Sequence, residues 1–509
     1  MKRNVVSNME EQIKVENAEA FLRECEALFQ TGDARKQINE LFEKEYQTFT
    51  GKVIVLDDDP TGIQTVHDVD VYTDWTKENL KQGLSAPEKL FFVLTNSRSF
   101  SVQKTVQVHK EIAKNAADAA KETGREFLMI SRGDSTLRGH YPLETQTLRT
   151  ELEEQTKVKF DGEVLCPFFR EGGRFTINGI HYVREKENLV PAAQTEFAKD
   201  KTFGYQHSFL PEYIEEKSGK SVKAAEVELV TLKELRSLQF DAIEARLYEK
   251  KDYTWIVADA IEEADIKAFA IILMRLMKRG KHYLIRSAAA VPKVFGNISD
   301  RPLLTKDELI REFTNKELVK NEDSLKQCLE GGMVLVGSHV KKTTRQLECL
   351  KQSEKPLEWI EFHVSEWKNE GGLEKEAVLA AKAAEEAMAQ GKTAVVYTSR
   401  AVVDFSGASA EELLAISVQI SDAVTSVVSR LNKRPRFLIA KGGITSSDVG
   451  TIALAVKKAR VMGQVQPGIP VWMTGSESRF PGLPYIIFPG NVGEEDTLRK
   501  IVELLTDGQ

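Results

Sequence analysis

The sequence has few cysteines, and they are far apart. Four occur in 509 residues, namely Cys25, Cys166, Cys328 and Cys349. No pair has CxxC spacing, and no set has the spacing of metal ligands, so neither a disulfide framework nor a zinc site is indicated. The pattern is typical of free thiols in a reducing compartment.

Long apolar runs are also missing. The most apolar stretch, near Ala268–Met277, is too short to cross a bilayer and contains Arg275. The amino terminus carries Glu10, Glu11 and Glu16 and has no apolar core segment, which predicts that no signal peptide is present. We therefore expect a cytoplasmic protein without a membrane partner.

A positive charge excess is absent as well. The formal net charge is −7, whereas proteins that bind nucleic acid or anionic membranes usually present a basic surface. We expect no nucleic-acid partner. An acidic protein can still bind an anionic metabolite where arginines gather locally.

The length and the hydrophobic pattern predict a two-domain α/β protein. A chain of 509 residues exceeds what one hydrophobic core usually supports. Short apolar runs alternate with amphipathic helical patterns in both halves, which indicates two mainly parallel wound sheets flanked by helices. The expected divisions are a helical extension (residues 1–50), a first domain (51–295), a linker region (296–328) and a second domain (329–509).

Three consecutive acids follow the first apolar run. Val53–Leu56 is succeeded by Asp57, Asp58 and Asp59, and then by the turn Pro60-Thr61-Gly62. Open α/β sheets bind ligands at the carboxyl ends of their strands, and adjacent carboxylates repel one another, so stability alone does not favour them there. The pattern indicates a proton acceptor, a nucleophile or a metal ligand. Helix capping or a solvated loop is the structural alternative.

Two further strand ends carry polar side chains. Arg98 follows the run Leu90–Leu94, and the segment Ser131–His140 follows the run Phe127–Ile130. The arginines at these ends can form paired hydrogen bonds with a carboxylate or phosphate, and Asp134 can bind hydroxyls. Together the three ends predict a crevice for a small polyhydroxylated anion. Pairing of the arginines with local acids is the plainer alternative.

Glycine-rich turns recur in the second half. Ser338 lies in a strand–turn–helix pattern, and Gly442-Gly443-Ile444-Thr445 forms an expected anion-binding nest to which Lys441 adds charge. Gly490 lies in another turn, after the last apolar run. The segment around Gly442 and Gly443 is not a Walker A loop, because the pattern GxxxxGK[ST] is absent. In the first half, the glycine-rich segment Glu171–Gly179 favours either close approach to a ligand or a hairpin turn.

These segments together resemble the four-carbon acid sugar kinase family, once known only as a domain of unknown function. The resemblance is carried by Asp58–Gly62, Ser97-Arg98-Ser99, Arg132–Gly139 (RGDSTLRG) and Gly442–Thr445, in the order of the family. It implies a kinase that uses ATP to phosphorylate the terminal hydroxyl of a tetronate, such as threonate, erythronate or an oxo-tetronate. The first domain would bind the acid sugar and the second the nucleotide.

The resemblance also implies roles for individual residues. The sugar-acid contacts would be Asp58 or Asp59, Arg98, Arg132, Gly133, Asp134 and Ser135, and the nucleotide contacts would be Ser338, Gly442, Gly443, Ile444, Thr445 and Gly490. One of the two aspartates would accept the hydroxyl proton, and Asp59 is favoured over Asp58. Mg²⁺ is expected to bridge the phosphates with few protein ligands. Shorter members usually have lysine in place of Arg132 and lack the extension before residue 50. We expect this extension to be the interface of a homo-oligomer.

Two other functions fit part of the pattern. In a haloacid dehalogenase-like phosphatase Asp57 would be the nucleophile and Asp59 the general acid, with Thr95, Asp259 and Asp265 in supporting roles. That interpretation leaves the segment Asp134–Gly139 and the whole second half unexplained. A non-catalytic sugar-acid sensor would keep Arg98 and Arg132 but would not need the nucleotide loop.

Overall fold

The chain folds into two compact units. The computed structural model describes residues 14–29, 32–59, 62–313, 330–400, 410–490 and 492–506. The first unit comprises Met1–Gly62 with Asp74–Ser299, and the second comprises Ile63–Thr73 with Asp300–Gln509. Each unit is built on a mainly parallel sheet flanked by helices, which confirms the predicted α/β class.

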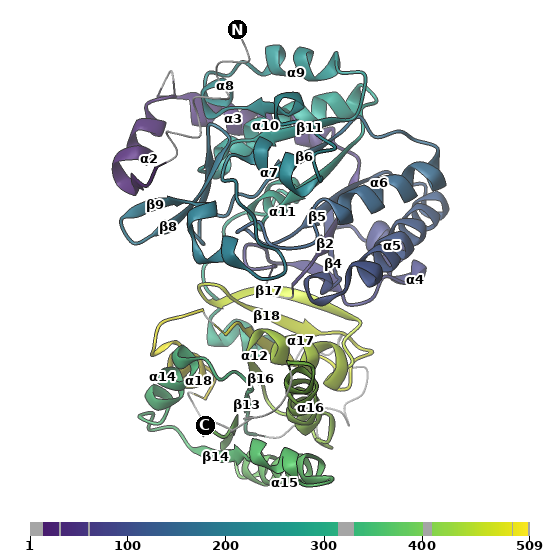
Figure 1. Ribbon diagram of the computed structural model, residues 1–509. Coiled ribbons are helices and arrows are strands. Elements are labelled where there is room, and N and C mark those ends of the chain that lie inside the picture. The colour runs from purple at the N-terminus through teal and green to yellow at the C-terminus, as the bar shows by residue number, and fades with distance from the viewer. Residues whose placement is uncertain are drawn as a thin grey trace. The chain divides into compact units, whose positions relative to one another are not determined.

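A parallel sheet forms the centre of the first unit (Figure 1). Its hydrogen-bonded order is β10-β11-β6-β12-β5-β2-β4, and every neighbouring pair is parallel. Strand β2 is buried along its whole length, as expected for a strand covered on both faces. The strands are β2 (Lys52–Asp57), β4 (Leu90–Leu94), β5 (Phe127–Arg132), β6 (Gly162–Cys166), β10 (Glu228–Val230), β11 (Thr254–Ala258) and β12 (Tyr283–Ser287).

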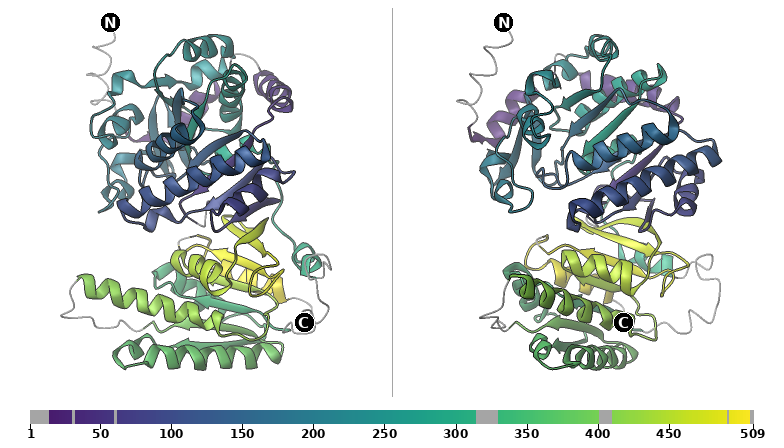
Figure 2. Two further views of the ribbon diagram at one scale, coloured as in Figure 1. Left: turned by 90° about the vertical axis from the view of Figure 1, so that its right-hand side faces the viewer. Right: turned by 45° about the vertical axis from the view of Figure 1, so that its right-hand side comes forward.

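Helices cover both faces of this sheet. Helices α5 and α6 lie side by side on one face, and α10 lies on the other, where α3 packs over it (Figures 1 and 2). Most residues of α10 are buried because the helix lies between the sheet and α3. The helices of this unit are α2 (Ala18–Glu26), α3 (Ala34–Gln47), α4 (Lys77–Ser85), α5 (Val102–Thr123), α6 (Leu143–Thr156), α7 (Leu210–Lys217), α8 (Leu232–Arg236), α9 (Phe240–Tyr248), α10 (Glu263–Lys278) and α11 (Ala290–Phe295).

A small antiparallel sheet accompanies the parallel one. Its order is β1-β9-β8-β7, and its strands are β1 (Glu16–Asn17), β7 (Arg174–Ile177), β8 (Ile180–Glu185) and β9 (Asn188–Pro191). Asn178 and Gly179 form the turn between β7 and β8 with φ angles of 51° and 75°. This is the two-residue turn that Asn-Gly favours, so the hairpin interpretation of the glycine-rich segment is correct at this point.

The amino-terminal extension is built into the first unit. It is helical, as predicted, with the helices α2 and α3, and its strand β1 pairs with β9. The buried guanidinium of Arg236 bridges to the extension: it donates to Asp265 at 2.7 and 2.9 Å and to the carbonyl oxygen of Cys25 at 2.7 Å. Arg35 of the extension donates to Glu262 at 2.9 Å.

The second unit has a mixed sheet. Its order is β3-β17-β18-β19-β16-β13-β15-β14; the pairs from β19 to β14 are parallel, and those from β3 to β19 are antiparallel. The strands are β3 (Val69–Tyr72), β13 (Met333–Val336), β14 (Leu357–Phe362), β15 (Thr393–Thr398), β16 (Leu438–Lys441), β17 (Lys458–Gln466), β18 (Ile469–Thr474) and β19 (Pro484–Phe488). The helices are α12 (Lys306–Phe313), α14 (Lys341–Leu350), α15 (Gly372–Ala389), α16 (Ala410–Ser429), α17 (Gly443–Asp448) and α18 (Thr497–Thr506).

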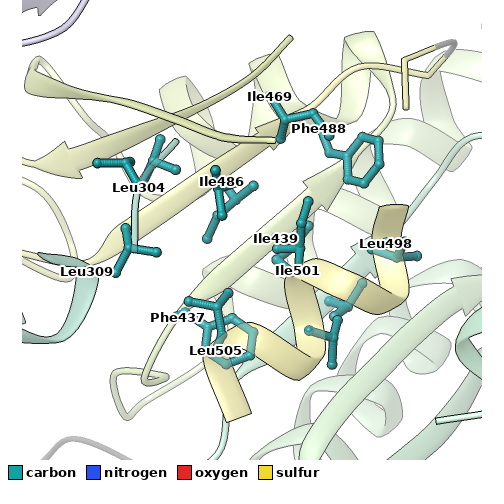
Figure 3. Packing of buried hydrophobic residues seen from close by; sticks show 14 of the residues in the cluster. Leu304, Leu309, Phe437, Ile439, Ile469, Ile486, Phe488, Leu498, Ile501 and Leu505 are labelled. Atoms are coloured by element: carbon teal, nitrogen blue, oxygen red, sulfur yellow. The ribbon is translucent and has the colours of Figure 1, made fainter. Parts of the chain in front are cut away.

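The core of the second unit lies between its sheet and α18. Leu498, Ile501 and Leu505 recur on one face of α18, and they face Ile439 and Ile486 of the sheet (Figure 3). Spacing of three and four residues puts these side chains in one stripe, so the amphipathic pattern of the last helix determines its packing.

Two predicted boundaries differ from the structure. The strand Val69–Tyr72 was expected in the first domain, but it belongs to the second unit and pairs antiparallel with β17. Leu304 and Leu309 were expected in a linker, but they are 3% and 0% exposed in the core of the second unit. Both differences arise because the packing partners are distant in sequence. The remainder of the expected linker, residues 314–329, lies outside the described residues.

The helices of the described ranges include none that is both long and apolar enough to cross a membrane.

Replacing Arg236 by Met should strongly destabilise the first unit. The substitution leaves Asp265 buried without its cation, and the loss of one partner of a buried ion pair typically costs about 3–5 kcal/mol. Chemical denaturation followed by tryptophan fluorescence measures the free energy of unfolding. Arg23→Ala is the matched control, because the Arg23–Glu19 pair lies on the surface of α2. Equal effects of the two substitutions would show that Arg236 does not anchor the extension.

Candidate functional site

The three polar strand ends of the first unit meet at one edge of its sheet. Asp57 ends β2, and the register places it beside Leu94 of β4 on one side and Arg132 of β5 on the other. The loops that follow these strands therefore start next to one another. The structure thus brings together the sugar-acid residues that the sequence predicts.

The acids of β2 are neutralised by arginines of the two neighbouring loops. Arg98 makes a two-point contact with Asp58, with distances of 2.7 Å from Nη2 to Oδ1 and 3.1 Å from Nε to Oδ2. Its Nη1 atom also lies 3.1 Å from Oδ2 of Asp59. Arg132 donates through Nη1 to Oδ1 of Asp57 at 3.0 Å. The alternative of pairing with local acids is therefore correct for Arg98 and Arg132.

Asp57 is enclosed rather than open to a ligand. It is 1% exposed, and burial raises its pKa to about 7 although Arg132 acts in the opposite direction. A Cβ atom on Gly62 would lie 2.1 Å from Oδ2 of Asp57, so the backbone of Gly62 covers that oxygen. A nucleophile needs a clear approach to the reacting centre, and Asp57 does not have one.

The other acids of the phosphatase interpretation hold the fold together. Asp259 accepts hydrogen bonds from the backbone amides of Asn178 and Gly179 at 2.7 and 2.8 Å, and Asp265 pairs with Arg236. Among the residues with described positions, no group of three or more acids, histidines or cysteines could hold a metal ion. The geometry therefore speaks against this interpretation. Thr61, which completes the Asp57-x-Asp59-x-Thr61 pattern of the phosphatases, lies outside the described residues.

Asp58 and Asp59 differ in access. The side chain of Asp58 is 2% exposed, whereas that of Asp59 is 26% exposed. A proton acceptor must reach the group from which it takes the proton. Of the two candidates, Asp59 is the one that a ligand can approach.

The loop after β5 carries Asp134 and Ser135. Burial by itself would raise the pKa of Asp134, but Arg98 and Arg138 hold it well below its usual range. Nε of Arg138 donates to Asp134 at 2.8 Å, and the carbonyl oxygen of Ser135 lies 2.8 Å from Nε2 of His181. Asp134 is thus an ionised hydrogen-bond acceptor, and its loop is held in place by the contact between His181 and Ser135.

Sequence reasoning missed a buried ion pair beneath these loops. Arg286, on β12, donates to Glu144 of α6 at 2.5 Å and to the hydroxyl of Ser131 at 2.8 Å, and the hydroxyl of Ser97 donates to Glu144 at 2.6 Å. A Cβ atom on Gly133 would lie 2.1 Å from Nη2 of Arg286. Glycine is therefore required where the backbone crosses the guanidinium. The only signal in the sequence is an arginine directly after an apolar run.

A pocket of about 880 Å³ lies at the carboxyl edge of the sheet in the second unit. The six nucleotide contacts implied by the family resemblance all line it: Ser338, Gly442, Gly443, Ile444, Thr445 and Gly490. They come from the ends of β13, β16 and β19, which the parallel register brings together.

The pocket depends on close backbone approach. A Cβ atom on Gly337 would lie 2.2 Å from Oγ1 of Thr445, and Gly442 has a φ angle of 129°, a conformation that L side chains rarely adopt. The turn after β13 and the turn after β16 therefore lie directly against each other. Such turns can direct backbone amides at a phosphate group.

Arg400 and His339 also line this pocket, although neither is among the predicted nucleotide contacts. Nη1 of Arg400 donates to the carbonyl oxygen of Ser338 at 2.5 Å. Its Nε and Nη2 atoms are buried, and they have no hydrogen-bond partner in the part of the chain that the structure describes. The signal for Arg400 in the sequence is again an arginine shortly after an apolar run.

The prediction that Lys441 adds positive charge to the pocket is wrong. It is fully buried and donates to the carbonyl oxygens of Pro489 and Gly490 at 3.1 and 3.4 Å. Burial lowers its pKa to about 7. Lys441 therefore secures the turn that contains Gly490.

Glu163 is a further buried acid in the first unit. It lies on β6 beside β12 and is 1% exposed. Its Oε2 atom accepts a hydrogen bond of 3.2 Å from the hydroxyl of Tyr253. Burial raises the pKa of Glu163 to about 7, so this carboxyl is largely protonated in the folded protein below that pH.

Comparisons with known proteins identify both parts of the chain. Residues 53–294 match a family described as a sugar-binding N-terminal domain, and residues 333–498 match one described as a nucleotide-binding C-terminal domain. No protein with curated annotation matches the chain.

Two solved structures share the fold. One is a Haemophilus influenzae protein assigned to a family of unknown function, DUF1537, with a TM-score of 0.57, 18% identity and coverage of 88% of this chain and 99% of its own. The other is a Salmonella typhimurium LT2 protein, described provisionally as a tRNA synthase, with a TM-score of 0.59, 18% identity and coverage of 88% and 98%. At this identity the likeness shows the fold alone.

Replacing Glu163 by Gln should change how stability depends on pH. Between about pH 4.5 and pH 7 the folded wild type keeps the proton that the unfolded chain loses, so its free energy of unfolding falls as the pH rises. The variant has no titrating carboxyl at this position. Its free energy of unfolding relative to wild type should therefore increase by up to about 3 kcal/mol between about pH 4.5 and pH 7. Urea denaturation at pH 5 and pH 7.5 measures the difference.

The exposed residue Glu154 provides the control, as Glu154→Gln. A stability difference between Glu163→Gln and wild type that stays constant with pH would contradict the buried, protonated state of Glu163.

Proposed function

The chain belongs to the four-carbon acid sugar kinase family, in which a sugar-binding N-terminal domain precedes a nucleotide-binding C-terminal domain, and we propose that it transfers a phosphoryl group from ATP to the terminal hydroxyl of a four-carbon acid sugar. The observation that carries the proposal is the accessible carboxylate of Asp59 at a strand end where arginines neutralise the two more deeply buried acids. Such a site can accept a proton while remaining close to electrically neutral.

In the proposed reaction, Asp59 accepts the proton of the terminal hydroxyl. The hydroxyl oxygen forms a bond to the γ-phosphorus of ATP, the bond from that phosphorus to the β–γ bridging oxygen breaks, and ADP leaves. Phosphoryl transfer of this kind depends on positioning and charge stabilisation. Magnesium arrives with ATP as part of that substrate.

Arg98 orients the proton acceptor. Its guanidinium holds Asp58 at two points and reaches Asp59 with the remaining nitrogen. The rigid geometry of the guanidinium fixes both carboxylates at once, which lysine could not do. Asp134 and Ser135 are the proposed partners of the substrate hydroxyls.

In the second unit the pocket around Gly442 is the proposed site of the nucleotide. The glycine turns allow backbone amides to approach phosphate groups, and Arg400 is a cation at the same pocket. The predicted contacts Ser338, Thr445 and Gly490 surround the same space. A pocket of this kind supports a kinase over a non-catalytic sensor, which would not need it.

A coupled assay tests the function directly. ADP formation should appear with at least one member of a panel of threonates, erythronates and their 2- and 3-oxo relatives, and only when ATP is present. Hydrolysis of p-nitrophenyl phosphate without ATP would instead favour the phosphatase. Nucleotide binding without turnover on any acid sugar would favour the sensor.

Replacing Asp59 by Asn should abolish most of the turnover. Loss of a positioned proton acceptor typically lowers kcat by about 10²–10⁴-fold. ATP affinity, measured by calorimetry, should be unchanged because the proposed nucleotide pocket lies in the other unit. Asp241→Asn is the matched control, since the side chain of Asp241 is 97% exposed. Retained turnover would contradict the assignment, and so would loss of ATP binding with preserved binding of the acid sugar.

Replacing Gly442 by Ala should weaken ATP binding. The alanine would keep a strained positive φ angle, and its Cβ atom would lie 3.1 Å from Oγ1 of Thr445 in the same turn and 3.3 Å from Cβ of Ser338 in the turn after β13, so these neighbours must shift. We expect the Kd for ATP to rise by about tenfold or more, equivalent to at least about 1.4 kcal/mol. Binding of the acid sugar should stay unchanged.

Gly391→Ala controls for backbone strain. Gly391 also has a positive φ of 76°, but the nearest atom to its Cβ position, 3.6 Å away, belongs to Glu330. Unchanged ATP binding by Gly442→Ala would remove this pocket from the nucleotide site.

A further inference from the structure

Arg174, the first residue of β7, is a cation that forms no direct ion pair with a carboxylate of the described residues. The one hydrogen bond that its side chain makes with described atoms goes to the carbonyl oxygen of Gly172 in its own turn. Its Nε atom is buried and has no hydrogen-bond partner among those atoms. The side chain is nevertheless half-buried.

Four arginines at or beneath the candidate site are paired with carboxylates. Arg98 binds Asp58 and Asp59, Arg132 binds Asp57, Arg138 binds Asp134, and Arg286 binds Glu144. An additional carboxylate at Arg98 or Arg132 would compete with these acids and would meet their negative charge. The arginines that the sequence marks most clearly are therefore poor binders of a substrate carboxylate.

Arg174 lies beside the loop that carries the proposed hydroxyl contacts. Its guanidinium carbon is 5.6 Å from the ring centre of Phe197, and that of Arg138 is 5.1 Å from the same ring. Asp134, the partner of Arg138, also acts electrostatically on Arg174. The ring of Phe197 thus joins Arg174 to the edge of the candidate site.

The strand pair β7–β8 holds this position firmly. His181 of β8 lies 2.8 Å from the carbonyl oxygen of Ser135 through Nε2 and 3.0 Å from the hydroxyl of Thr176 through Nδ1. The strand that carries Arg174 and the loop that carries Asp134 are therefore connected through one buried histidine. A ligand that contacts both would find them already arranged.

Partial burial makes the unpaired charge costly. Removing a guanidinium from water without a counterion is unfavourable, and burial lowers the pKa of Arg174. An anion with two oxygens in one plane would offset this cost, because a carboxylate accepts paired hydrogen bonds from a guanidinium. The proton acceptor Asp59 would then act on the opposite end of the same small molecule.

We propose that Arg174 binds the carboxylate of the acid sugar and is the residue that selects acids over neutral polyols. The inference rests on the proposed function and names the recognition of the substrate within it. Arg98 and Arg132 are assigned instead to the acids of β2.

The test measures binding without requiring turnover. Isothermal titration calorimetry with threonate and erythronate, and with the neutral polyols threitol and erythritol, is run on wild type, Arg174→Gln and Arg184→Gln. Arg184, on the adjacent strand β8, is exposed and serves as the matched control. We expect Arg174→Gln to weaken binding of the acids by about tenfold to a hundredfold, the usual range for a charge-assisted contact, and to leave polyol binding unchanged.

Kinetics give a second reading. Arg174→Gln should raise KM for the acid with a smaller effect on kcat, because the carboxylate contact is the same in the ground state and the transition state. Arg174→Lys keeps the charge but loses the paired geometry, so its KM for the acid should lie between those of wild type and Arg174→Gln. It replaces the Gln variant if that variant does not fold. ATP affinity and thermal stability verify the fold of each protein.

The outcomes separate the two proposals. If wild type binds or phosphorylates the acids and Arg174→Gln does so equally well, the assignment of Arg174 is overturned and the kinase function stands. If wild type neither binds nor phosphorylates any acid of the panel, the proposed function fails and the assignment of Arg174 fails with it. A loss of acid binding by Arg184→Gln equal to that by Arg174→Gln would also overturn the assignment.

Discussion

The first unit depends on the neutralisation of three successive carboxylates at one strand end. Asp57, Asp58 and Asp59 repel one another, and cations from both sides offset this repulsion. Arg98 comes from the loop after β4 and Arg132 from the end of β5. The strand order β5-β2-β4 brings both arginines to the acids. The charge balance of the site therefore depends on the order of strands in the sheet.

Much of this arrangement could be predicted from the sequence. An apolar run such as Leu90–Leu94 is long enough and clean enough to define a strand, and the structure gives it the same bounds. Polar residues directly after such runs necessarily gather at one edge of a parallel sheet. That rule is sufficient to bring Arg98, Asp134 and Gly442 to the carboxyl ends of their sheets. The roles of these residues stay predictions.

The rest could not be predicted, because it depends on partners that are distant in sequence. Strand β3 pairs with β17, almost four hundred residues later, and the run Val69–Tyr72 contains nothing that identifies its partner. The pair Arg286–Glu144 joins a strand to a helix on a different part of the chain. The orientation of Lys441, toward carbonyl oxygens rather than the pocket, is decided by the turn at Gly490.

Arg132 explains why the identity of the cation matters at the end of β5. Its Nη1 atom lies 3.0 Å from Asp57 and 3.7 Å from Asp58, so one guanidinium contacts two carboxylates. A lysine at this position, which the family resemblance implies for shorter members, would be a compact point charge and would favour one partner. Asp57 has a pKa raised to about 7 by burial, so it can hold a proton without losing its hydrogen bond to Arg132. The identity of the cation at this position therefore bears on the charge of the acid cluster, and the proposal assigns recognition of the substrate carboxylate to Arg174, outside that cluster.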